Sequence, residues 1–124
     1  MLTYDGGTIM AVKILIQRKV KPGKEKELYE TVKELRSKAI HAEGYISGET
    51  LCSIEDPYVH LVISTWKSLE DWNHWADSPE RKVFQQKTDA MLEEPTKITP
   101  YQYESISPNM DEILTGLEFS VQDE

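Results

Sequence analysis

His60 is the residue of this chain best placed for acid–base chemistry. It lies in the segment 58–66, where alternation puts it on the same side as three other residues, Val62, Ser64 and Trp66. An imidazole exchanges a proton near neutral pH, so a histidine that faces a cavity can act as a general base. The alternative is a histidine at a strand end in contact with water. His41 falls at a predicted helix end and His74 on the polar side of a predicted short helix.

Aromatic and amide side chains offer a way to hold a ring. Trp66 ends the same segment, Trp75 lies one position from the apolar stripe of the following helix, and Tyr101 lies in the last predicted strand. Such side chains suit a flat aromatic ligand, although the same spacing also suits a core, which we expect for Trp72. Gln17, in a strand that we expect beside that of His60, can donate a hydrogen bond to a substrate oxygen.

Common catalytic motifs are missing from the sequence. It contains no P-loop, no dinucleotide-binding glycine fingerprint, no GxSxG elbow and no HExxH motif. The single cysteine, Cys52, excludes an internal disulfide and a cysteine-based metal cluster.

Length and charge narrow the class of protein. A chain of 124 residues suits one domain. Its net charge of −8 argues against nucleic acid and anionic membranes as partners. The sequence has no apolar run long enough for a membrane span and no signal peptide at its N-terminus, so we expect a cytoplasmic protein.

Apolar periodicity predicts the elements that would position these residues. Alternation predicts strands over 10–20, 45–54, 58–66 and 98–106. A long amphipathic helix is predicted over 24–42, with a turn residue at Gly44. Ser68 is expected to cap a short helix, and Ser78-Pro79 to start another that runs to about Glu93.

Buried faces are also predicted. The first strand should bury Val12, Ile14, Ile16 and Val20, and the long helix Leu28, Val32, Leu35 and Ala39. In the last helix the expected stripe is Val83, Lys87, Ala90 and Met91.

The element order is β-α-β-β-α-β. Right-handed crossovers then favour an α+β, ferredoxin-like fold, a four-stranded antiparallel sheet with helices on one face. We expect this domain to span residues 10–106, after a poorly ordered leader at 1–9 and before an acidic tail at 107–124.

Helices on one side leave the other face of such a sheet bare. Here that face carries aliphatic and aromatic groups, which soluble monomers rarely expose together. We therefore expect a homodimer in which two sheets pack face to face and enclose a pocket in each half, with His60 and Gln17 facing that cavity. The alternative is an interface filled by side chains, with no room for a ligand.

Three passages support a family resemblance that covers residues 10–106. They read RKVKPGKEKEL, GYISGETL and ISTWKSLEDWNHWADSPERKVF, and together they resemble the antibiotic biosynthesis monooxygenase family of dimeric α/β-barrel proteins. The resemblance implies oxygenases that act without cofactors on polycyclic aromatic substrates, quinol monooxygenases, or haem-degrading enzymes. In the cofactor-free members, a deprotonated phenol or quinol reduces oxygen directly.

The haem-degrading branch of that family uses an asparagine, a tryptophan and an axial histidine. In this chain the first position matches Gln17 and the second Trp75, but no histidine occurs around residues 85–87. The resemblance therefore does not extend to haem binding in the manner of that branch.

Two functions of different classes stay open. The first is an oxygenase for a small phenolic, quinol or polycyclic aromatic substrate that needs no metal or organic cofactor. His60 would be its base and Gln17 its hydrogen-bond donor, with a substrate-binding wall of Trp66, Trp75 and Tyr101. The second is a non-catalytic dimeric module that binds a small aromatic molecule or serves assembly. An isomerase or other non-oxidative enzyme is a third, weaker reading, because fold does not fix chemistry.

Overall fold

The computed structural model describes residues 2–4, 7–9 and 11–104. The strands are β1 (Leu2–Tyr4), β2 (Gly7–Ile9), β3 (Val12–Lys19), β4 (Tyr45–Cys52), β5 (Val59–Trp66) and β6 (Lys97–Gln102). The helices are α1 (Glu25–Ala39), α2 (Leu69–Ala76) and α3 (Pro79–Asp89). The end of the last predicted strand and the acidic tail lie outside the described residues.

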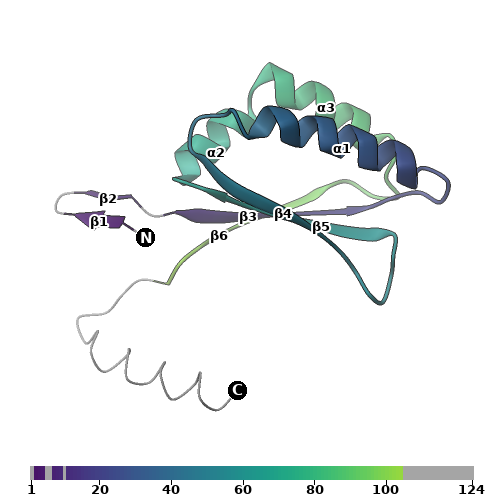
Figure 1. The fold of residues 1–124 in the computed structure, drawn as a ribbon, viewed down its shortest axis with the longest axis horizontal. Coiled ribbons are helices and arrows are strands. Elements are labelled where there is room, and N and C mark those ends of the chain that lie inside the picture. Colours follow the sequence, from purple (N-terminus) through teal and green to yellow (C-terminus); the bar gives the residue numbers. More distant parts are fainter. Residues whose placement is uncertain (1, 5–6, 10, 105–124) are drawn as a thin grey trace, which may run out of the picture.

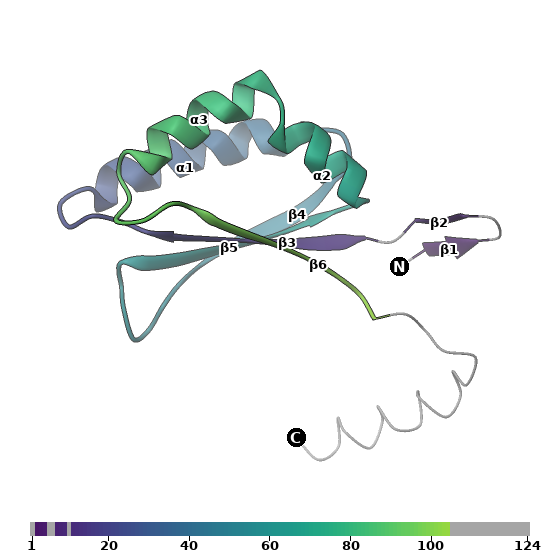
Figure 2. The same cartoon turned by 180° about the vertical axis from the view of Figure 1, so that it is seen from behind.

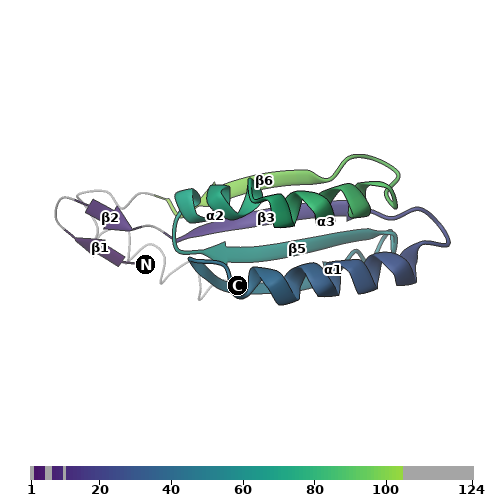
Figure 3. The ribbon, with the colours of Figure 1, turned by 90° about the horizontal axis from the view of Figure 1, so that it is seen from above.

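Four of the strands form one antiparallel sheet in the order β4-β5-β3-β6. All three helices cover one face of it (Figure 1). Seen from above, α1 lies over the β4–β5 side, and α2 and α3 over the β3–β6 side (Figure 3). This is the predicted ferredoxin-like arrangement, in which the second helical connection is divided into α2 and α3.

Alternation along β3 separates the two faces of the sheet. Val12, Ile14 and Ile16 are buried beneath the helices. The intervening residues point to the bare face, where the Lys13 amine donates a 2.9 Å hydrogen bond to the Thr65 hydroxyl. The predicted strand pattern is therefore confirmed, as is the buried stripe of α1, where Leu28, Leu35 and Ala39 are buried.

Turns and caps lie where the sequence predicts them. Gly44, the predicted turn residue, adopts a positive φ angle of 85°, which other residues rarely adopt, and Gly23 after β3 adopts one of 90°. The Ser68 hydroxyl accepts from the Asp71 amide at 3.1 Å, and the Ser78 hydroxyl from the Arg81 amide at 3.2 Å. These caps fix the first turns of α2 and α3.

The predicted buried stripe of the last helix is wrong at Val83, Lys87 and Ala90, whereas Met91, just beyond α3 (Pro79–Asp89), is buried as expected. Val83 is 51% exposed, whereas Arg81, Phe84 and Thr88 are buried. The helix turns so that the large ring of Phe84 enters the core, and residues three before and four after it follow onto the same face. This rotation is what brings Arg81 inside.

The hydrophobic core consists of two clusters. The larger one contains all three tryptophans and is formed by Val12, Ile14, Ile16, Leu35, Ala39, Trp66, Trp72, Trp75 and Phe84. The smaller one is formed by Val20, Leu28, Met91 and Leu92. Trp72 is a core residue, as predicted.

β1 and β2 pair as an antiparallel hairpin within the segment that we expected to be a poorly ordered leader. Figure 2 shows this hairpin beyond the N-terminal end of β3. Within the described residues, no helix has the length and apolar character needed to span a membrane.

Candidate functional site

Two adjoining hollows lie between the helices and the sheet. The inner one is a cavity of about 50 Å³ walled mainly by the tryptophan-rich end of the core. The outer one is a groove of about 450 Å³ between α1 and the strands β4 and β5. They share four lining residues, Arg18, Val32, Arg36 and Val62, and are therefore direct neighbours.

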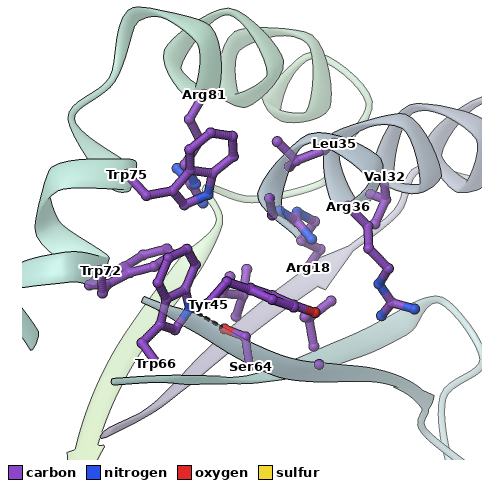
Figure 4. Close-up of a pocket in the computed structure, with 14 residues that line it drawn as sticks. Arg18, Val32, Leu35, Arg36, Tyr45, Ser64, Trp66, Trp72, Trp75 and Arg81 are labelled. Carbon is purple, nitrogen blue, oxygen red and sulfur yellow. Dashed lines mark hydrogen bonds between the residues drawn. The ribbon is translucent and has the colours of Figure 1, made fainter. Parts of the chain in front are cut away.

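Aromatic rings wall the inner cavity (Figure 4). The Trp66 ring meets Tyr45 edge-on at 5.4 Å and Trp72 at 5.6 Å between ring centroids. The Trp66 indole nitrogen donates a 3.1 Å hydrogen bond to the Ser64 hydroxyl. This bond fixes the ring and satisfies its polar edge, so that the wall is rigid as well as apolar.

Two arginines enter this apolar space. Arg18 rises from β3 and Arg81 descends from α3 (Figure 4), and they are only 3% and 4% exposed. The Arg81 guanidinium lies over the Trp72 ring at 5.0 Å and donates a 3.0 Å hydrogen bond to the Gln85 side-chain oxygen. It is thus held from one side by a ring and an amide.

Both arginines lack full compensation for their burial. Burial, and secondly the charge of Arg81, lower the pKa of Arg18 to about 10. Burial also lowers the pKa of Arg81. Among residues 11–104, neither arginine forms a salt bridge, and Arg18 Nε and Arg81 Nη2 have no hydrogen-bond partner.

Asp89 is the acidic residue that acts on this pair from nearby. Its charge raises the pKa of both arginines against the effect of burial. Its carboxylate accepts hydrogen bonds from Gln85 at 2.9 Å and Thr96 at 2.8 Å. A chain of contacts therefore runs from Arg81 through Gln85 to Asp89 at the surface.

His60 lines the groove rather than the inner cavity. Its strand partner is Arg18, so both side chains leave the same face of the sheet toward α1. Cys52 and Thr50 of β4 line the groove beside it, and the Thr50 hydroxyl accepts a hydrogen bond from Arg36. The groove thus combines a half-buried imidazole with a cationic side chain.

The predicted site residues divide between the two faces of the sheet. Trp66 and Trp75 line the cavity, and His60 lines the adjoining groove. Gln17 pairs with Leu61, one position out of phase with His60, and is exposed on the bare face. Tyr101 pairs with Lys13 on that same face and is 54% exposed.

The expected pairing of His60 with Gln17 in one pocket is therefore wrong. Adjacent residues in a strand point to opposite faces, and the register places Arg18, not Gln17, beside His60. The hollow also lies beneath the helices of a single chain, not between two sheets.

Sequence reasoning missed Arg18 and Arg81. A signal existed for Arg18, since it interrupts the buried stripe of β3 between Ile16 and Val20. No comparable signal existed for Arg81, because its burial depends on the rotation of α3 around Phe84. As for metals, the described residues contain no group of three His, Cys, Asp or Glu side chains able to hold an ion.

Comparison with known proteins gives both a sequence and a structural relationship. The sequence profile described as antibiotic biosynthesis monooxygenase matches residues 11–87. No curated protein matches the chain in sequence.

Three solved structures illustrate the structural likeness. A conserved protein from Methanosarcina mazei Go1 has a TM-score of 0.73 and 22% identity, covering 77% of this chain and 95% of its own. Rv0793 from Mycobacterium tuberculosis has a TM-score of 0.70 and 13% identity over 77% of this chain and 96% of its own. A variant of SnoaB, a cofactor-independent oxygenase from Streptomyces nogalater, has a TM-score of 0.69 and 11% identity, covering 80% of this chain and 98% of its own. At these identities the likeness shows a shared fold.

Proposed function

Because the chain belongs to the antibiotic biosynthesis monooxygenase family, we propose that it is a cofactor-independent monooxygenase. Its substrate would be a small phenolic, quinol or polycyclic aromatic molecule, held in the neighbouring cavity and groove between helices and sheet. The observation that carries the proposal is this site itself, with rigid aromatic walls at its inner end and a histidine on its outer part.

The chemistry starts with removal of a proton from a phenol or quinol hydroxyl. The resulting anion is electron-rich and reduces molecular oxygen directly. In an anthrone-type substrate, one oxygen atom enters the ring system as a carbonyl and the other leaves as water with the two hydrogens of the oxidised carbon. The protein must orient the ring, take the proton and stabilise the negative oxygen.

His60 is the residue of the groove that we assign as the base. It is half-buried, and the groove beside it is large enough for a ring. Trp66 and Trp75 would limit the inner end of the site. Gln17 and Tyr101 lie on the opposite face of the sheet and have no role in this site of the same chain.

A homodimer is part of the proposal. The bare face of the sheet carries a row of apolar and aromatic side chains, Leu15, Leu51, Leu61, Ile63 and Tyr101. A second copy packed on this face would cover them, as two face-to-face sheets do in many proteins. The active cavities would then lie on the outer, helix-covered sides of the pair.

Oxygen uptake by the purified full-length chain tests the function. The protein, treated with a chelator and supplied with no flavin, is mixed with anthrone and with a panel of quinols in an oxygen electrode. We expect uptake well above spontaneous oxidation, with one oxygen molecule consumed per anthrone and one labelled atom in the product from ¹⁸O₂. Retained binding of these compounds without any enzyme-dependent uptake would instead indicate a binding module.

A further inference from the structure

Arg18 and Arg81 present an unusual electrostatic arrangement at the inner end of the site. Both are nearly fully buried, and each keeps a guanidinium nitrogen without a partner among residues 11–104. A buried charge is costly unless it is paired, and an unsatisfied buried donor adds to that cost. An apolar side chain at either position would avoid both costs, which indicates that the charges serve something beyond packing.

The two side chains approach one space from opposite layers. Arg18 comes from the sheet and Arg81 from α3, and both line the inner cavity (Figure 4). The contacts with Trp72 and Gln85 hold Arg81 from one side and leave Nη2 open. A group placed between the arginines could therefore accept a hydrogen bond from each.

Charge balance favours an anion as that group. Two buried positive charges lie in the cavity, and a third, that of Arg36, lines it at the side shared with the groove, where it bonds to Thr50. Asp89 is the acidic residue whose charge acts on the buried pair. One negative charge between the guanidinium groups would satisfy the open donors and cancel the mutual repulsion of the arginines. Guanidinium groups bind planar oxyanions particularly well, because their donors form a flat fork.

We propose that Arg18 and Arg81 bind an oxyanion, a carboxylate or a phenolate, carried by the aromatic substrate of this site. The inference rests on the proposed function, because it names the class of substrate that the same cavity accepts. The cavity of about 50 Å³ has room for the anionic group, and the groove of about 450 Å³ has room for the ring. This orientation directs the ring toward His60.

Isothermal titration of the full-length protein with two pairs of probes tests this preference. Benzoate is compared with benzamide, and ionised 4-nitrophenol with 4-nitroanisole, in a buffer without carboxylate or phosphate. We expect the anion to bind at least about tenfold more tightly than its neutral counterpart in one or both pairs, since a charged hydrogen bond contributes about 1.5–3 kcal/mol. The pair that shows the preference identifies carboxylate or phenolate as the source. Equal binding within both pairs would overturn the proposal.

Variants connect the preference to the two arginines. Arg18→Gln and Arg81→Gln should each weaken binding of the preferred anion by about tenfold to a hundredfold and leave the neutral probe unaffected. Lys82→Gln removes the same charge from the exposed side of α3 and should change the affinity for neither probe. Should a glutamine variant fold poorly, Arg18→Met and Arg81→Met replace the buried charge with an apolar chain of similar length. Unchanged anion affinity in folded variants would contradict the proposal.

Binding and turnover are measured separately, so the two proposals can fail separately. Anion preference that depends on the arginines, without oxygen uptake, would support the anion site and contradict the proposed oxygenase function. Oxygen uptake on quinols without any anion preference would support the oxygenase and contradict the anion site.

Discussion

Arg18 and His60 are partners across β3 and β5, and both side chains point from the sheet toward α1. The pairing joins a cation that can hold a substrate oxygen to an imidazole that can take a proton. The register of β3 and β5 sets the distance between them along the groove.

Replacement of His60 should separate catalysis from binding. His60→Ala is expected to lower oxygen uptake with a quinol or anthrone by roughly a hundredfold or more, the usual scale for loss of a general base. Benzoate affinity should stay near that of the wild type. His74→Ala, on the exposed side of α2, is the matched control and should leave turnover unchanged. Equal turnover in both variants would remove His60 from the mechanism.

Arg18→Met should stabilise the empty protein or leave its stability unchanged. Replacing buried charges with well-packed apolar groups is often neutral or stabilising by about 1–4 kcal/mol, and Arg18 has no salt bridge to lose among the described residues. Urea unfolding measures the change. Saturating benzoate should stabilise the wild type but not the variant, since a ligand stabilises only the state that binds it. A large loss of stability in Arg18→Met would mark the residue as structural.

The pH dependence of stability should carry the sign of a lowered arginine pKa. Burial holds the pKa of Arg18 at about 10 in the folded protein, below its ordinary value, so the unfolded chain binds this proton more tightly. The wild type should therefore gain stability relative to Arg18→Met as pH rises above 10. Below about pH 9 the difference in unfolding free energy between the two proteins should be constant. Other titratable groups line the same site, namely Tyr29, Lys33, Arg36, Tyr45, Cys52, His60 and Arg81. These groups are present in both proteins, so their contribution largely cancels in the difference in unfolding free energy. Denaturant unfolding over pH 7–11 measures that difference.

Gly44→Ala and Gly23→Ala form a matched pair. Both glycines have positive φ, so alanine is strained at each by about 1–2 kcal/mol. A methyl group at Gly44 would also collide with the Asp71 side chain, whereas at Gly23 it would meet nothing within 4 Å. We expect Gly44→Ala to lower the unfolding free energy clearly more than Gly23→Ala. Equal losses in thermal or urea unfolding would show that Asp71 moves aside freely.

Oligomeric state should depend on the bare face of the sheet. Ile63→Lys places a charge at the centre of that face and should shift sedimentation from a dimer to a monomer at micromolar concentration. Val83→Lys makes the same change on the exposed side of α3 and should leave the dimer intact. A wild type that sediments as a monomer would contradict the homodimer.

Much of the fold could be predicted because it depends on local patterns. Alternation in β3, the apolar stripe of α1 and the serine caps each act within a few residues. The site depends on register and rotation instead. One position of register separates Gln17 from Arg18, and the rotation of α3 toward Phe84 decides whether Arg81 or Val83 is buried. Alternation along β3 carries a signal for Arg18, but the pairing of Arg18 with His60 and the rotation of α3 both result from packing between distant segments.

The division of the core into two clusters has a consequence for how the domain moves. Arg18 separates the tryptophan cluster from the smaller cluster around Val20 and Leu28. Few apolar contacts hold the smaller end, so amide hydrogens there are the ones expected to exchange through local opening, while the tryptophan end exchanges only on global unfolding. Arg18 lies in the sequence between Ile16 of the larger cluster and Val20 of the smaller one, so a ligand bound to it should also protect the amide hydrogens of the smaller cluster from exchange.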